Sequence, residues 1–243
     1  MSFFVDIHSH VVPSGDDGAQ SVDDGVVLCD SAASHGTAIL FATPHVWPEL
    51  PLTPARERAV RAAYEQVRER TALDVRLGFE LTPAPPLLDE DMRRYALEGT
   101  DVVLIEVPFT GAADVLVRVC EHIEASGLHP VVAHPERAEV VLDRPALAGE
   151  LAERWPLQVN ATSIVGRHGP EIEALAWSLL DDGLVSLVAS DGHRATRPPH
   201  VDDAYDAVVA RVGETQARSL FDGSAVGVTA ARQLPSRAAA QGA

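Results

Sequence analysis

Short apolar runs alternate with amphipathic segments along almost the whole chain. Seven of these runs are rich in β-branched residues and carry few polar positions, which is typical of strands buried on both faces. We predict strands at residues 3–8, 38–43, 75–81, 101–107, 131–134, 157–160 and 185–190.

Capping residues indicate helices between most of these strands. Ser21 and Thr53 are N-cap types, Pro54 takes a first helical position, and Gly36 and Gly127 stand where helices should end. A proline-rich loop with a short helix is expected after the third strand. The predicted helices cover residues 22–35, 54–70, 113–126, 170–182, 201–212 and 214–221.

Strand-then-helix units with short connections favour parallel strands covered by helices. The predicted fold class is therefore α/β, a distorted TIM-like barrel of seven β/α units, with an open doubly wound sheet as the alternative. The length of 243 residues suits one such domain, which we assign to residues 1–233. Residues 234–243 are rich in Ser, Arg, Ala and Gly, and we expect a disordered tail there.

Side chains that bind metals in proteins follow the predicted strands. The carboxyl ends of strands in a barrel form one rim, where barrel enzymes place their chemistry. We therefore expect these scattered residues to converge on a single site. They are His8, His10, His45, Glu80, Glu106, His134, Asp191, His193 and one carboxylate of the pair Asp16-Asp17.

Imidazole combined with carboxylate suits zinc, manganese or iron. Nine such groups exceed what one ion with four to six ligands can use, so two or three ions fit better. Four carboxylates with three divalent ions leave a charge of about +2, which a phosphate monoester dianion would balance. Arg137 could present a planar fork to the phosphate oxygens. These residues favour hydrolysis by a water molecule whose pKa the metal lowers.

Composition excludes several other classes of protein. The net charge of -17 argues against nonspecific binding to nucleic acid or to anionic membranes. Cys29 and Cys120 lack an arginine six residues later, since His35 and Ser126 stand there, which excludes a cysteine-based phosphatase. No apolar run approaches the roughly 20 residues of a membrane helix, and the N-terminal run is too short for a signal peptide. We expect a cytoplasmic protein with buried, reduced thiols.

Taken together, five segments resemble the PHP superfamily (polymerase and histidinol phosphatase). Within it they are most similar to the bacterial protein-tyrosine phosphatases that act on tyrosine kinases of capsule and exopolysaccharide synthesis. The segments are Asp6-Ile7-His8-Ser9-His10, Asp16-Asp17-Gly18, Ala42-Thr43-Pro44-His45, His134-Pro135-Glu136-Arg137 and Ser190-Asp191-Gly192-His193.

The resemblance implies a centre of three divalent ions, with Mn²⁺ first and Zn²⁺ or iron as alternatives. It also implies that Arg137 and Arg197 bind phosphate, with Arg194 as the alternative to Arg197. The substrate implied is a phosphotyrosine-bearing protein, namely the tail of a bacterial tyrosine kinase. The ligand positions that match the family are His8, His10, Asp17, His45, Glu80, Glu106, His134, Asp191 and His193.

Two further residues are candidates for substrate contact. His168 lies in the loop after the sixth predicted strand, and Trp47 closely follows His45, where it could form an apolar wall for a tyrosyl ring. Three alternative functions stay open. They are a phosphatase for a small metabolite such as histidinol phosphate, an amidohydrolase-type enzyme and a kinase-binding scaffold without activity. The absence of lysine disfavours the second, because many such enzymes bridge their metals with a carboxylated lysine.

Overall fold

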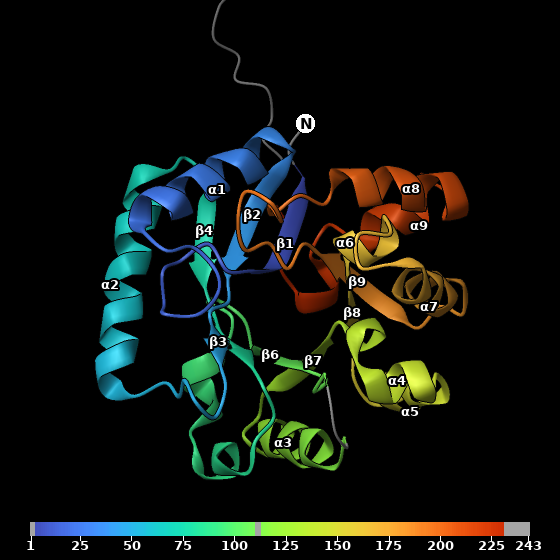
Figure 1. The fold of residues 1–243 in the computed structure, drawn as a ribbon, viewed down its shortest axis with the longest axis horizontal. Coiled ribbons are helices and arrows are strands. Elements are labelled where there is room, and N and C mark those ends of the chain that lie inside the picture. The colour runs from blue at the N-terminus through green and yellow to red at the C-terminus, as the bar shows by residue number, and fades with distance from the viewer. Residues whose placement is uncertain (1–2, 110–112, 231–243) are drawn as a thin grey trace, which may run out of the picture.

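The computed structural model describes residues 3–109 and 113–230 and forms a barrel of parallel strands with helices around it (Figure 1). The strands are β1 (Phe4–Ser9), β2 (Thr37–Ala42), β3 (His45–Val46), β4 (Asp74–Leu77), β5 (Glu80–Leu81), β6 (Val102–Glu106), β7 (His129–Ala133), β8 (Leu157–Asn160) and β9 (Val185–Ala189).

The strands pair in two groups, β1-β2-β4 and β3-β5-β6-β7-β8-β9, and every pairing is parallel. The groups join because β2 leads directly into β3, and β4 into β5. Between them, Gly78 N donates to Ala42 O at 2.8 Å and Glu80 N donates to Pro44 O at 3.2 Å. The nine short strands therefore follow seven paths around the barrel, as the sequence predicts.

Hydrogen bonds beyond the strand ends join β1 to the β9 side of the barrel. At the carboxyl end, His10 N donates to Gly192 O at 2.7 Å. At the opposite end, Leu220 and Phe221 lie between the two strands, and Val5 N donates to Phe221 O at 2.9 Å. The prediction of a barrel rather than an open sheet is confirmed.

All six predicted helices form, with boundaries within two residues of the prediction. They are α1 (Val22–Ser34), α2 (Pro54–Arg70), α3 (Asp114–Ala125), α7 (Pro170–Asp181), α8 (Asp202–Val212) and α9 (Glu214–Ser219). The expected caps are present, because Ser21 Oγ accepts from Asp24 N at 3.1 Å and Thr53 Oγ1 accepts from Arg56 N at 3.2 Å.

The prediction of one strand at 75–81 is wrong, because the segment breaks between β4 and β5. A Cβ added at Gly78 would overlap the side chain of Leu97, so the chain is displaced where Leu97 fills the gap between β4 and β6.

The tail predicted at 234–243 lies outside the described residues. Elements that the pattern did not predict are β3, α4 (Glu139–Asp143), α5 (Ala146–Ala152), α6 (Ala161–Ile164), η3 (Pro135–Arg137) and η4 (Ser224–Val226). The expected short helix after the third strand is a pair of 3₁₀ turns, η1 (Pro85–Asp89) and η2 (Met92–Tyr95).

The apolar core has an inner and an outer layer, because strand side chains alternate between the two faces. On β6, Val102 and Leu104 belong to the cluster inside the barrel, whereas Val103 and Ile105 pack outward under the helices. Glu106 continues the inward series at the rim. The alternation that builds the core therefore also aims this carboxylate at the mouth of the barrel.

Two further predictions bear on chemistry outside the mouth. Cys29 and Cys120 are buried free thiols, and burial raises the pKa of each to about 12, so neither can act as a nucleophile near neutral pH. Within residues 3–109 and 113–230, no helix has both the length and the apolar character needed to cross a membrane.

Candidate metal centre

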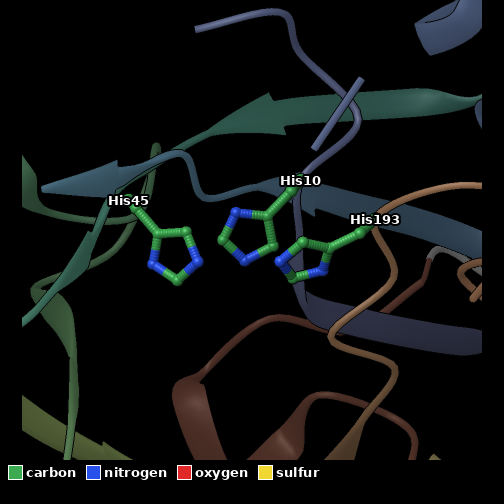
Figure 2. A group of neighbouring side chains, drawn as sticks. All are labelled: His10, His45 and His193. Carbon is green, nitrogen blue, oxygen red and sulfur yellow. The ribbon is translucent and has the colours of Figure 1, made fainter. Parts of the chain in front are cut away.

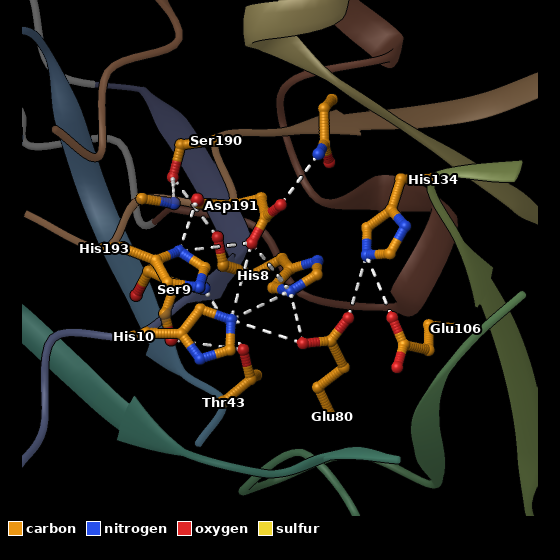
Figure 3. Close-up of polar contacts among 12 residues, drawn as sticks. His8, Ser9, His10, Thr43, Glu80, Glu106, His134, Ser190, Asp191 and His193 are labelled. Carbon is orange, nitrogen blue, oxygen red and sulfur yellow. Dashed lines mark hydrogen bonds and ion pairs between the residues drawn. The ribbon is translucent and has the colours of Figure 1, made fainter. Parts of the chain in front are cut away.

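The mouth of the barrel brings together all nine side chains that the sequence singled out as ligands. They come from β1, β3, β5 and β6, from the residues after β1, β7 and β9, and from the loop before α1. Figure 3 shows most of them pointing toward one another. Asp17 is the exception in exposure, with 58% of its side chain accessible, whereas His8, His10, Glu80 and Asp191 are buried.

Four of these side chains bring one atom each close to the others. The atoms are His8 Nε2, His10 Nε2, Glu80 Oε2 and Asp191 Oδ1, and five of their separations lie between 3.1 and 3.4 Å. Two ligands bound to one Zn²⁺ at about 2.0–2.1 Å in a tetrahedron lie about 3.3 Å apart. These five separations are therefore those expected between ligands of one first-row metal ion.

Glu80 extends this group toward a second one. Its other oxygen, Oε1, accepts a hydrogen bond from His134 Nε2 at 2.8 Å, and Glu106 Oε2 lies 3.9 Å from the same nitrogen. One carboxylate thus faces His8 and His10 with one oxygen and His134 with the other. This is the arrangement that a bridging carboxylate between two ions requires.

A third group lies on the other side of His10. Figure 2 shows the rings of His10, His45 and His193 next to one another, and each can offer a nitrogen within 4.8 Å of the others. Asp17 Oδ1 lies 3.3 Å from His193 Nε2 and 3.6 Å from His45 Nε2. Since the groups share members, they form one continuous set of donors.

Several buried atoms in the centre have no hydrogen-bond partner in the part of the chain that the structure describes. They include Glu80 Oε2, Glu106 Oε2 and His45 Nδ1. Glu80 Oε2 and His45 Nδ1 lie only 2.8 Å apart without hydrogen-bond geometry. Buried polar atoms are normally paired, so converging unpaired donors fit a cation between them.

Backbone strain marks the same place. Among the described residues, His134 (φ 33°) and Asp191 (φ 52°) are the non-glycine residues with positive φ. Residues other than glycine rarely adopt positive φ, and such outliers gather at functional sites. His134 directly follows β7 and Asp191 lies two residues after β9, so the turn at each strand end directs the side chain into the mouth.

Burial and neighbouring charges shift the pKa values of several side chains in the centre. Burial raises the pKa of Glu106 above its usual range, and the negative charge of Glu80 adds to this effect. Burial opposes the ionised form of Glu80 as well, but the histidines around it outweigh that cost and hold its pKa well below the usual range. Burial lowers the pKa of His193 to about 4. Metal ligands are neutral imidazoles and ionised carboxylates, so the lowered pKa values of His193 and Glu80 favour binding, whereas Glu106, His8 and His10, whose pKa values are raised, would release a proton when an ion binds.

The two predicted phosphate-binding arginines border the centre. Arg137 Nη1 donates to Asp191 Oδ2 at 2.6 Å, and Arg197 Nη2 lies 3.6 Å from Asp191 Oδ1. Arg197 Nη2 also contacts His193 Nδ1. Arg194 instead donates from Nε to the carbonyl of Asp17, so it supports the loop and the geometry favours Arg197.

The structure also separates Asp16 from Asp17. Asp16 Oδ2 accepts from His45 N at 3.0 Å and lies 3.4 Å from His10 Nδ1, so it orients both histidines. Asp17 faces His193, and the hydrogen bond with His193 lowers the pKa of Asp17 to about 2. The two carboxylates therefore face different histidines, and Asp17 as the ligand of the pair stays a prediction.

The candidate substrate residues lie at two edges of the mouth. His168 contacts Thr162 Oγ1 at 2.9 Å, and burial, followed by the charges of Arg137 and Arg197, lowers its pKa to about 4. The ring of Trp47 packs at 4.6 Å from that of His45.

The sequence did not single out Gln158 and Asn160, which lie on β8. Gln158 Oε1 contacts His8 Nδ1 at 2.9 Å, Gln158 Nε2 donates to Asn160 Oδ1 at 2.8 Å, and Asn160 Nδ2 donates to Asp191 Oδ2 at 2.8 Å. Carbonyl contacts of this kind fix which nitrogen of a histidine faces a metal. Their spacing, two polar residues at i and i+2 inside an apolar strand, was the available indication.

A further group, His35, His200 and Asp202, lies between α1 and α8. His35 Nδ1 lies 2.7 Å from Asp202 Oδ2, and His200 Nε2 contacts Ser31 Oγ at 2.8 Å. These contacts link the two helices, and Asp202 Oδ1 has no hydrogen-bond partner in the part of the chain that the structure describes.

Comparison with known proteins places this geometry in a family. The family model described as "Capsular polysaccharide synthesis, CpsB/CapC" matches residues 4–228. Tyrosine-protein phosphatase YwqE of Bacillus subtilis is 30% identical over 208 residues, which cover 82% of each chain.

Solved structures agree with that match. A chain from the crystal structures of YwqE from Bacillus subtilis and CpsB from Streptococcus pneumoniae, which are metal-dependent tyrosine phosphatases, superposes with a TM-score of 0.80 at 29% identity, covering 89% of this chain and 90% of that one. A D-hydantoinase from Bacillus sp. AR9 superposes with a TM-score of 0.58 at 15% identity, covering 91% and 70%, which is a likeness of fold alone. The chain therefore belongs to the CpsB/CapC family of capsular polysaccharide synthesis.

Proposed function

We propose that this chain is a metal-dependent protein-tyrosine phosphatase that hydrolyses phosphotyrosine monoesters. The observation that carries the proposal is the close group of His8, His10, Glu80 and Asp191, which Glu80 and His10 join to two further donor groups and which Arg137 and Arg197 border. The activity named for the relatives YwqE and CpsB supports the same reaction.

The cofactor we propose is a set of three divalent ions, with Mn²⁺ as the preferred metal. The first would be held by His8, His10, Glu80 and Asp191. The second would be held by Glu80, Glu106 and His134, and the third by Asp17, His45 and His193. When bound there, divalent ions supply a water nucleophile at neutral pH and neutralise the phosphate oxygens.

The chain's own residues position the phosphate. Arg137 and Arg197 approach Asp191 from the rim, so their remaining N–H groups can donate to phosphate oxygens above it. The fixed donors hold the ester in one orientation and stabilise charge that develops during transfer. Gln158 and Asn160 keep His8 and Asp191 in place beneath.

The physiological substrate we propose is a phosphotyrosine-bearing protein, the tail of a bacterial tyrosine kinase of capsule or exopolysaccharide synthesis. The family description supports this choice, because it concerns capsular polysaccharide synthesis. We propose a cytoplasmic location, where such a tail would be found.

Turnover of three substrates by the purified chain loaded with Mn²⁺ tests the proposal. We expect a phosphotyrosine peptide to be hydrolysed with higher kcat/KM than a phosphoserine peptide or histidinol phosphate. His134→Ala should abolish activity, whereas His129→Ala, an exposed histidine at the opposite end of β7, should not. Equal or better turnover of histidinol phosphate would favour the metabolite phosphatase instead, and full activity of His134→Ala would contradict the assigned centre.

A further inference from the structure

We infer that Phe109 is the residue that selects aryl over alkyl phosphate esters, by forming an aromatic wall beside the bound phosphate. The inference rests on the proposed phosphatase function and adds a specificity determinant to the same site. It arises from an exposed aromatic ring whose position no other part of the site explains.

Phe109 is unusual in its exposure. In the described part of the chain it is one of two large hydrophobic residues that are strongly exposed, at 41%; the other, Val27, lies on the surface of α1. A single exposed apolar residue is ordinary. The location of this one, three residues after Glu106 and at the rim of the metal centre, is what calls for an explanation.

The ring of Phe109 contacts one proposed metal ligand, His134, and one proposed phosphate-binding residue, Arg137. It is nearly parallel to the ring of His134, with an interplanar angle of 9° and centroids 5.6 Å apart. The guanidinium carbon of Arg137 lies 4.8 Å from the centroid of the Phe109 ring. A phosphate held by Arg137 would therefore have its ester substituent next to this aromatic ring.

The backbone holds Phe109 in place although its side chain is exposed. Its carbonyl accepts a hydrogen bond of 3.0 Å from Glu139 N at the start of α4. With the ring also resting on His134 and Arg137, its position is set on two sides. A preformed wall of this kind binds a ligand without a large cost of ordering.

The chemistry of the two ester classes differs at this position. A phosphotyrosyl or phenyl ester carries a ring one bond from the bridging oxygen, which can stack on Phe109 or meet it edge to face. A phosphoseryl or ethyl ester offers only a short aliphatic chain. The wall therefore favours binding of aryl esters and leaves the reacting groups untouched.

Trp47 is the competing candidate for the wall. Its ring packs against His45, and it lines an apolar cavity of about 620 Å³ together with residues such as Leu52, Leu87 and Tyr95. Trp47 lacks a described contact with either arginine, within residues 3–109 and 113–230, whereas Phe109 contacts Arg137. This contact is the reason for choosing Phe109.

The test compares phenyl phosphate with ethyl phosphate in wild type and in Phe109→Ala, Phe109→Tyr and Trp47→Ala. For Phe109→Ala we expect KM for phenyl phosphate to rise about tenfold, equivalent to about 1.4 kcal/mol, with little change in kcat. The kcat/KM for ethyl phosphate and the inhibition constant of inorganic phosphate should stay within about twofold. Phe109→Tyr should restore the aryl preference, and Val27→Ala should behave as wild type.

Three results would overturn the inference. They are equal losses on both esters in Phe109→Ala, an unchanged KM for phenyl phosphate in that variant, and loss of the aryl preference in Trp47→Ala alone. Failure of the proposed function has a different signature, since wild type would then hydrolyse neither ester or would show no preference for phenyl over ethyl phosphate. That result would remove the basis of this inference as well.

Discussion

Among single residues, the neutral side chains behind the ligands matter as much as the ligands. Gln158 is fully buried, and its Oε1 holds His8 Nδ1 so that Nε2 faces the centre. For Gln158→Leu we expect a loss of about 10- to 100-fold in metal affinity or in activity, because outer partners of ligating histidines have effects of that size. Metal titration and kcat/KM measure it.

A matched substitution separates this effect from general damage. Gln66 is exposed on α2, where its amide donates to Ala62 O, so Gln66→Leu should leave metal affinity unchanged. Wild-type metal affinity and activity in Gln158→Leu would show that His8 needs no such support.

His168 gives the site a dependence on pH. Burial, followed by the charges of Arg137 and Arg197, lowers its pKa from 6.5 to about 4, so the unfolded chain binds this proton more tightly between those values. The contribution of neutral His168 to stability is complete above pH 6.5 and is lost as pH falls toward 4. In His168→Gln, the free energy of unfolding relative to wild type should therefore improve as pH falls through this window.

Urea denaturation at several pH values measures that difference. His129→Gln provides the comparison, because His129 is exposed at the far end of the barrel. A difference between His168→Gln and wild type that stays constant from pH 6.5 to 4 would contradict the assigned protonation.

Among the elements, local chemistry decided what could be predicted. The start of the helix at residues 54–70 could be predicted because Thr53 and Pro54 fix it through their own side chains. The break at Gly78 could not be predicted, since it depends on Leu97, which reaches the strand from the far side of two short 3₁₀ turns. Long-range packing of that kind leaves no periodic trace in the sequence.

In the candidate site too, residues with a local signal in the sequence could be predicted, and those that depend on the fold could not. His8, Glu106 and His134 were predictable because a charged or imidazole residue after an apolar strand is conspicuous. The choice between Asp16 and Asp17 rested on resemblance, because neighbouring carboxylates in a turn differ only in where the fold points them. Gln158 escaped attention since neutral amides are ordinary in any strand.

In the turn after β9, Gly192 packs closely against Pro199. A Cβ added at Gly192 would lie 2.5 Å from Pro199 Cα and 2.6 Å from Pro199 N, so the turn carrying Arg197 would have to move. We expect Gly192→Ala to cost about 1–3 kcal/mol of stability through overpacking. It should also raise KM for the phosphate ester, because Arg197 is displaced.

Gly149 is the matched control. It lies inside α5, where an added Cβ meets no atom within 4 Å among the described residues, so Gly149→Ala should stabilise the helix slightly or have no effect. Thermal unfolding and steady-state kinetics distinguish the two variants. Equal behaviour of both would show that the Arg197 turn tolerates the displacement.

For the whole molecule, the centre and the closure of the barrel depend on each other. His8 lies in the first strand and His10 directly after it, whereas Asp191 and His193 follow the last strand, so the first donor group spans the seam between them. Opening that seam would separate the donors. Metal binding at this place therefore contributes directly to the free energy of folding.

Metal removal tests this coupling. At a free ion concentration 100 times the dissociation constant, binding to the folded state alone adds about 2.7 kcal/mol, which corresponds to about 5–10 °C in Tm for a chain of this size. This amount is for one ion, so we expect a chelator to lower Tm by at least as much and Mn²⁺ to restore it, as measured by scanning calorimetry. Asp191→Asn should lose most of the response, because it weakens the donor group at the seam, whereas Asp143→Asn at the end of α4 should keep it. A Tm that is indifferent to chelator in the wild type would mean that the barrel closes without its metals, and the histidines and carboxylates at the seam would then need another explanation.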